Sequence, residues 1–538
     1  MSENNLIESW RKTSANIAGI FTVMILAVFP LSFRNFYFDI LVAKYQYYYV
    51  GVITAVVVML AAALIYLCID FRQYGGENVR MLLRTFSMRK LKAADWAMLA
   101  FVLMAAVSTF QSEYFYESFW GNEGRYCGLF LILLYGAGYL IIVGCLRFKR
   151  WYLDAFLTAG ILAGILGVLQ YLMFNPFGMK TGLSSGSEWV FTSTIGNVNT
   201  YTSYLALLLG VGVVLFIQEK SRLRKGFYLL SVTVTMISLV AGISDNSYIT
   251  FMVLFGLLPL YLFTDLKGIK QYALLVSVLL AVFLLIGWVN GTFPDHVVGI
   301  QGLFRVIVQF RWFPHAVVGV WILTGALYAA DWRMSRGGTT YRCGWARWVW
   351  LGVLVLAALI LCGVLYDVNV LGNTERYHSL KNYLLFDDDW GTHRGFVWRI
   401  TMESYGRFPL LHKIFGYGPE TFGIISVQNY LAEAGERYHE KFDNVHNEYL
   451  QYLFTIGIAG LTAYLALLMT SLREMLRTAV RTPAVMGIIY ALACYWVQAA
   501  VNLSTPIVTP IMFALMMTGI AAGRRREETE DPSFGVHD

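Results

Sequence analysis

His446 occupies a setting in this sequence that suits acid–base chemistry. It lies in the stretch FDNVHNEYL, residues 442–450, directly before a long apolar run. Asp443 or Asn444 is predicted to cap a helix that begins there, with His446 in its first turn. The positive end of the helix dipole disfavours an added charge, so we expect a neutral imidazole. Such an imidazole can take a proton from a hydroxyl nucleophile, which typically contributes about 10²–10⁴ in rate. The alternative is that His446 and Asn447 are only polar residues at a membrane boundary.

A second group of candidates lies in THRGFVWRITMESYGRFPLLHKIFGYGPETF, residues 392–422. Arg394 and Trp398 are four residues apart and share a helix face, whereas Arg399 points elsewhere on an ideal helix. Arginine suits a diphosphate because it is always charged, planar and able to bond through two nitrogens at once. The alternative is a solvated loop arginine.

Arg125, Arg305 and Arg311 are three further arginines near the ends of apolar runs. Charges close to a membrane core are expensive and usually functional, so each is a candidate for binding an anionic substrate. For Arg305 and Arg311, snorkelling at the interface is an equal alternative.

Asn197 and Asn199 lie in TSTIGNVNTYTSYLALLL, residues 192–209, where a polar turn opens an apolar run. They could bind sugar hydroxyls or cap the helix, and capping is the more conservative interpretation. The carboxylate run Asp387-Asp388-Asp389 could attract a divalent cation, but three adjacent residues do not converge on a metal unaided. We therefore predict no metal site and no cofactor.

These candidates belong to a membrane protein. The chain has 538 residues, of which 57% are hydrophobic and 14% charged, whereas soluble domains are about 45–50% apolar and about 25% charged. A span needs roughly 17–25 mostly apolar residues. We predict an all-α polytopic protein with about 12–14 transmembrane helices. The candidate spans lie near residues 16–33, 47–69, 94–111, 127–146, 152–173, 199–217, 227–243, 247–264, 272–289, 314–332, 347–366, 448–470, 485–502 and 506–523.

The distribution of positive charge predicts the orientation. With the N-terminus inside, about two thirds of the 41 Lys and Arg residues fall in cytoplasmic segments, and few lie in the short outer loops. Both termini are then cytoplasmic in a multi-pass inner-membrane protein. We divide the chain into an N-terminal bundle of about 11 spans (1–366), an extracytoplasmic loop with short amphipathic helices (367–446), C-terminal spans (447–523) and a cytoplasmic tail expected to be mobile (524–538).

Other classes of protein are disfavoured by the sequence. The net charge of +7 is spread in short clusters between apolar runs, so it does not indicate nucleic-acid binding. The six cysteines show no metal-binding or disulfide pattern. Walker A, G-x-S-x-G and H-E-x-x-H motifs are missing as well.

At several of these places the sequence resembles the O-antigen ligase/polymerase superfamily of bacterial membrane glycosyltransferases. The matching stretches are FWGNEGRYCGL, IGNVNTYTSYLALLL, RGFVWR with FPLLHKIFGYGPETF, and HNEYLQYLFTIGIAGL, over about residues 115–465. The resemblance implies a glycosyltransferase C-like architecture. It also implies a saccharide donor on an undecaprenyl diphosphate carrier, a glycan, lipid or protein acceptor, and a reaction outside the cytoplasmic membrane without a metal.

By that resemblance His446 assists the acceptor hydroxyl, while Arg394 and Arg125 hold the diphosphate. One departure is the absence of a Ser-Arg pair that many members carry between two central spans. Here the corresponding stretch is Ser244-Asp245-Asn246-Ser247. Either Arg305 or Arg311 replaces the missing arginine, or the donor head group is bound differently.

Two other functions fit the spans. A flippase or transporter of lipid-linked saccharides is expected to show charges within its spans and a two-fold repeat, neither of which is evident. A non-catalytic cell-envelope assembly protein would leave the Arg and His residues of the long loop unexplained.

Overall fold

The computed structural model describes residues 3–85, 91–184, 186–337 and 341–530. The end of the predicted tail, residues 531–538, lies outside this part. The described chain is almost entirely helical, and a two-stranded antiparallel pair, β1 (Phe191–Thr192) and β2 (Gly196–Asn197), is its only sheet.

Each of the fourteen predicted spans coincides with a helix. Ten helices in the described chain are long and apolar enough to cross a membrane, and three shorter apolar helices accompany them. The first span begins earlier than predicted, because the polar residues from Glu3 onward continue the helix. The helices are α1 (Glu3–Val23) with η1 (Met24–Val28) and α2 (Phe29–Leu31), α3 (Ile40–Tyr74), α5 (Ala93–Gln111), α7 (Leu129–Cys145), α8 (Trp151–Tyr171), α9 (Val198–Gln218), α10 (Arg222–Ala241), α11 (Asn246–Leu262), α12 (Leu266–Thr292), α14 (Phe313–Arg336), α15 (Ala346–Asn369), α20 (Glu448–Arg481), α21 (Val485–Gln498) and α22 (Thr509–Glu530).

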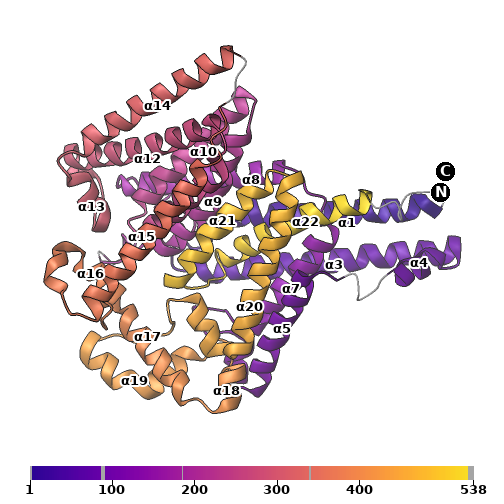
Figure 1. Ribbon diagram of the computed structural model, residues 1–538. Helices are drawn as coiled ribbons and strands as arrows, with labels where there is room; N and C mark the ends of the chain where they lie inside the picture. The colour runs from indigo at the N-terminus through magenta and orange to yellow at the C-terminus, as the bar shows by residue number, and fades with distance from the viewer. Residues whose placement is uncertain (1–2, 86–90, 185, 338–340, 531–538) are drawn as a thin grey trace.

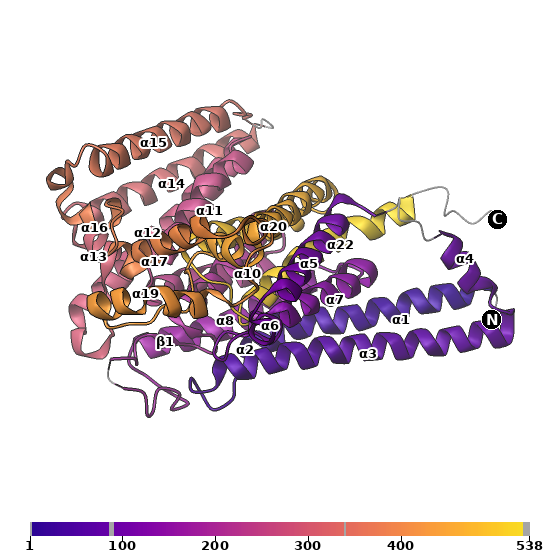
Figure 2. The same cartoon turned by 90° about the horizontal axis from the view of Figure 1, so that it is seen from below.

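Burial separates central helices from peripheral ones. α9 is rich in Leu and Val, is buried over almost its whole length, and packs against α10 and α21. The most apolar stretch of α15 contains no buried residue, so this helix presents its side chains to lipid. Figure 2 shows α15 at the edge of the bundle and α1 beside α3.

Short helices gather at one end of the bundle, which we call the loop end. Figures 1 and 2 show α16 to α19 there, with the first turns of α1 and the last turns of α22 on the opposite side. The segment between α15 and α20 has a small core of its own, which includes Phe396, Ile400, Phe422 and Val445. The short elements of the chain are α4 (Glu77–Thr85), α6 (Phe115–Trp120), η3 (Pro294–His296), α13 (Gly302–Gln309), η4 (Thr374–Leu380), α16 (Lys381–Leu384), α17 (Trp390–Arg407), α18 (Leu410–Phe415), α19 (Phe422–Tyr438) and η5 (Ala499–Val501).

The segment between α15 and α20 is attached to the bundle at a kink in α20. Gly457 has φ +69°, and a Cβ there would overlap the carbonyl oxygen of Ile414. Gly418 N–H donates to the Thr455 carbonyl at 2.9 Å, so α18 and the turn after it lie against the opened helix. Glycine is required at position 457 both by this conformation and by the close approach of the α18 backbone.

Candidate active site

His446 lies in the turn that leads into α20. Its own φ is +53°, and its backbone N–H donates to Asn444 Oδ1 at 2.9 Å. The helix begins at Glu448, three or four residues later than a cap at Asn444 or Asp443 implies. Its N-cap is Asn447, whose Oδ1 accepts from the N–H groups of Tyr449 and Leu450 at 3.1 Å each. The prediction that Asp443 or Asn444 caps this helix is therefore wrong, because Asn447 satisfies its first free donors.

The His446 ring is in an environment that disfavours protonation. Burial lowers the pKa of His446 to about 4, and the positive charges of Arg394 and Arg125 act in the same direction, while Asp443 opposes them. Nδ1 is buried and forms no hydrogen bond within the described part of the chain. The imidazole is therefore neutral at ordinary pH. The main cause is burial and not the helix dipole invoked from the sequence, because the helix starts two residues beyond the ring.

Arg394 begins the regular part of α17. The three residues before it, Gly391 to His393, all have positive φ, so the chain turns sharply into the helix. Arg394 Nη1 donates to the Gly391 carbonyl at 2.6 Å, and its buried Nε has no partner within the described residues. Burial lowers the pKa of the guanidinium, and the Asp245 carboxylate opposes this shift. Arg394 thus keeps hydrogen-bonding capacity available for an anion.

Trp398 connects the Arg394 helix to the His446 turn. It lies one turn after Arg394 on α17, and its Nε1 donates to the Val445 carbonyl at 3.1 Å. The shared helix face predicted for Arg394 and Trp398 therefore faces the residues that lead to His446.

A cavity of about 640 Å³ lies at the loop end, and Arg394 is part of its wall. One side comes from the start of α11 and from α13, including Asp245, Tyr248 and Leu303. The other side comes from the segment between α15 and α20, including Lys381, Tyr383 and Trp390. Tyr383 Oη donates to Asp245 Oδ2 at 3.3 Å across the cavity wall. His446 is not among the lining residues, but Arg394 is, and the charge of Arg394 acts on the His446 ring.

Arg125 reaches the same region from the loop between α6 and α7. Its Nε and Nη2 donate to the two carboxylate oxygens of Asp443 at 2.9 and 2.8 Å. This two-point pair joins residues 318 positions apart in the sequence. Burial acts to raise the pKa of Asp443, but Arg125 outweighs it and holds that pKa below its ordinary value.

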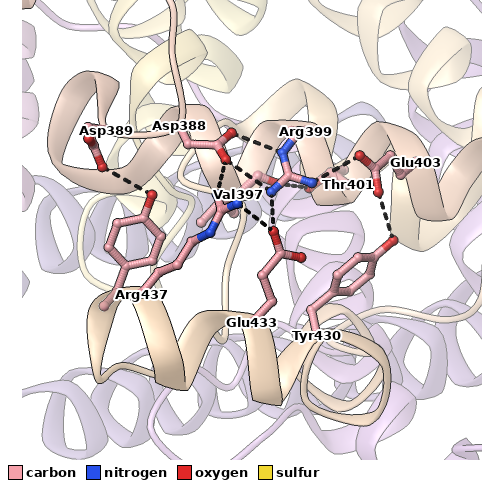
Figure 3. Close-up of polar contacts among 10 residues, drawn as sticks. Asp388, Asp389, Val397, Arg399, Thr401, Glu403, Tyr430, Glu433 and Arg437 are labelled. Carbon is pink, nitrogen blue, oxygen red and sulfur yellow. Dashed lines mark hydrogen bonds and ion pairs between the residues drawn. The ribbon is translucent and has the colours of Figure 1, made fainter.

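Arg399 is used within the segment itself, away from the His446 turn. It pairs with Asp388 through two nitrogens, and with Glu403 and Glu433 at 3.0 and 2.7 Å. Figure 3 shows this cluster, in which Arg437 also contacts Asp388. The guanidinium therefore ties α17 to α19, and its donors already face carboxylates instead of a substrate.

Arg305 and Arg311 are exposed. Arg305 lies on α13, and the Arg311 guanidinium is 5.6 Å from the centre of the Trp312 ring. The structure does not bring either of them to Arg394 or His446. Leu303, on the same short helix as Arg305, is the residue that reaches the cavity.

Asn197 and Asn199 hold the start of α9. Asn197 is its N-cap, with Oδ1 accepting from Asn199 N–H at 2.9 Å. Asn199 Oδ1 accepts from Ser244 Oγ at 2.7 Å and from Asn246 Nδ2 at 3.4 Å. The two asparagines thus support the junction between α10 and α11, where Asp245 and Asn246 line the cavity.

The carboxylates of the Asp387 to Asp389 run diverge. Asp388 pairs with two arginines, and Asp389 Oδ1 accepts from Tyr438 Oη at 3.1 Å (Figure 3). Within the described residues no group of three or more His, Cys, Asp or Glu side chains is arranged to hold a metal ion.

Three contributors to this region were not foreseen from the sequence. Asp443 was considered only as a helix cap, although it is the partner of Arg125. Asp245 was noted only because the position lacks an arginine. Glu420 was not considered; burial raises the pKa of its carboxyl to about 7, with Arg125 opposing, and Asn122 Nδ2 donates to its carbonyl at 2.5 Å. Of these three residues, only Asp443 could have been predicted to belong to the site, because it lies three residues before His446.

The fold and these side chains define a multi-span membrane protein that carries Arg394, in the wall of a cavity, and His446 at its loop end. Residues 314–465 match the family model described as O-Antigen ligase. This match runs from α14 into α20 and includes Arg394 and His446, and it supports the resemblance to the O-antigen ligase/polymerase superfamily. It supports a glycan ligase or polymerase activity of this general kind. No curated protein matches the chain significantly.

Proposed function

We propose that the protein transfers a saccharide from an undecaprenyl-diphosphate-linked donor to an acceptor hydroxyl on the outer face of the cytoplasmic membrane. The observation that carries this proposal is a half-buried histidine with a buried Nδ1 and a lowered pKa, under the influence of an arginine that lines a large cavity. The match to the O-antigen ligase model supports the same class of reaction.

His446 is assigned the role of general base. It removes the proton from the acceptor hydroxyl as the oxygen forms a bond to the anomeric carbon of the donor sugar. The bond from that carbon to the phosphate oxygen breaks at the same time, and the lipid diphosphate leaves with the electron pair. The proton then passes from His446 to solvent, which restores the neutral ring.

Arg394 is assigned to the diphosphate. Its buried Nε without a partner and its place in the cavity wall leave it able to bond phosphate oxygens. A fixed positive charge in a partly dry site stabilises the negative charge that develops on the leaving group. Lys381 lies in the same wall and adds a second positive charge. In this proposal, arginine and lysine carry the charge stabilisation, and no metal is invoked.

The orientation is part of the proposal. The distribution of Lys and Arg in the short loops favours cytoplasmic termini and an outer loop end. Single cysteines at exposed loop-end positions such as His439 should then react with a membrane-impermeant maleimide added to intact spheroplasts.

Replacement of His446 tests the proposal. His446→Asn is the preferred variant because asparagine tolerates the positive φ at this position. We expect transfer to fall by about 10²–10⁴, with the donor accumulating on the outer leaflet. His439→Asn is the matched control, since His439 is an exposed histidine of the same segment and also has positive φ. Normal product from well-expressed His446→Asn would refute the base assignment, and donor retained on the inner leaflet would indicate transport.

A further inference from the structure

The loop between α6 and α7 holds the turn that carries His446. Arg125 makes a planar two-nitrogen pair with Asp443, and Asn122 of the same loop donates to the Glu420 carbonyl. We propose that Arg125 is a positioning residue: its pair with Asp443 fixes the His446 turn, and it does not bind the donor diphosphate. The inference rests on the proposed function, because it assigns a role around the same histidine.

The two arginines near His446 differ in what their nitrogens do. Arg125 has both nitrogens of one edge bonded to a carboxylate, and it is not among the residues lining the large cavity. Within the described residues, Arg394 donates to one backbone carbonyl and its Nε has no partner, and Arg394 lines the cavity. A diphosphate binding the Nε–Nη2 edge of Arg125 would have to displace the Asp443 carboxylate, whereas the Nε of Arg394 can be reached without such a displacement.

Asp443 is placed where its pair with Arg125 can restrain the turn that carries His446. Asp443 lies three residues before His446, and the intervening residues are also held: Asn444 accepts from the His446 N–H, and Val445 accepts from Trp398. The Arg125 side chain is 23% exposed, so the pair is partly shielded from water on the arginine side. Loss of either partner frees the start of this turn, and loss of Asp443 also leaves the partly buried Arg125 charge without this partner.

Kinetics of single and double variants separate positioning from substrate binding. Arg125→Ala and Asp443→Ala should each lower kcat roughly tenfold or more while leaving the KM for the donor within about twofold, since the donor contacts remain. The double alanine variant should be no worse than the weaker single variant, because both changes remove one interaction. The exchanged pair, Arg125→Asp with Asp443→Arg, should recover part of the lost rate. Arg376→Ala is the control, as it removes an exposed arginine paired with Asp367 at the end of α15.

If the donor KM rises in Arg125→Ala but not in Asp443→Ala, the positioning role of Arg125 is refuted. The proposed transfer function would not be affected by that result. Multiplicative losses in the double variant would overturn the positioning role as well. Hydrogen exchange of the peptide spanning residues 439–447 provides a second measurement that does not need activity. Exchange should accelerate equally in both single variants and slow again in the exchanged pair; unchanged exchange in Arg125→Ala would refute the positioning role. If the wild type transfers no saccharide at all, the proposed function fails, and hydrogen exchange still decides whether Arg125 holds the turn.

Discussion

Acidification is expected to leave transfer by the free enzyme almost unchanged down to about pH 5. The reason is the environment of His446, where burial and two nearby arginines lower the pKa from 6.5 to about 4. At pH 5.5 a group with a pKa of 4 is about 97% neutral, whereas one with a pKa of 6.5 is about 9% neutral. The two cases differ roughly tenfold in the fraction of enzyme that holds a usable base.

The assay is the initial rate of transfer in proteoliposomes of zwitterionic lipid, with donor below its KM, at pH 5.5 and pH 7.5. The quantity kcat/KM reports groups of the free enzyme, so it is the value to compare. We expect the two rates to agree within about twofold. An acid limb with a midpoint near pH 6.5 would contradict the buried, neutral histidine. The pH dependence of the residual activity of His446→Asn is the control, because it reports any titrating group other than His446.

The same shift has a consequence for stability, and its sign can be worked out. His446 binds a proton less readily in the folded than in the unfolded protein, so its contribution is present above pH 6.5 and is lost as the pH falls toward 4. The pKa difference corresponds to about 3 kcal/mol, an upper value because the ring keeps some contact with solvent. Thermal unfolding in detergent should therefore show a steeper loss of stability between pH 6.5 and 4.5 in the wild type than in His446→Asn.

Three further predictions concern the supports of the site. Arg399→Ala should lower the stability of the segment between α15 and α20 by about 2 kcal/mol, because three carboxylates lose their cation. Limited proteolysis measures this loss of stability. The control is Arg407→Ala, which removes an exposed arginine of the same helix and should change the proteolysis rate little. Asn447→Ala should destabilise the start of α20 by about 1 kcal/mol, while Asn447→Asp should retain the cap; equal unfolding temperatures for the two would contradict the cap geometry. Gly457→Ala should abolish folding or activity, because the added Cβ would overlap the α18 backbone. Gly435→Ala is the control, because a Cβ there meets no other atom and the protein should fold normally. Expression level and the size-exclusion profile measure folding in both variants.

The membrane helices could be predicted because their signal is local. An apolar run of sufficient length must form a helix in lipid, where each backbone donor needs a partner within the segment. The span predicted to begin at residue 448 starts at Glu448 in the structure, and the two adjacent spans predicted at 227–243 and 247–264 form α10 and α11. The spacing of Arg394 and Trp398 also predicted a shared direction, because that depends only on the helical repeat.

The contacts between distant segments could not be predicted from local patterns. Arg125 and Asp443 are 318 residues apart, and no rule of spacing joins them. The prediction that Asp443 or Asn444 caps α20 is wrong for a different reason. Several residues between Asp443 and Asn447 can cap a helix, and the choice depends on where the chain leaves the positive-φ turn at His446, which tertiary packing decides. The cavity likewise arises from segments that meet only in the folded chain.

Under the proposed function, Arg394 affects the reaction twice. In the free protein its charge helps to keep His446 neutral by lowering the pKa of the ring. A bound diphosphate would place negative charge beside the guanidinium and cancel much of that effect, so the imidazole should become a stronger base when the donor is present. The base would then be weak and unprotonated in the empty site and stronger in the loaded one. This coupling predicts that the acid limb of kcat, which reports the loaded enzyme, has a higher midpoint than that of kcat/KM. Identical midpoints for the two parameters would show that the donor charge does not reach His446, and would place the diphosphate away from Arg394.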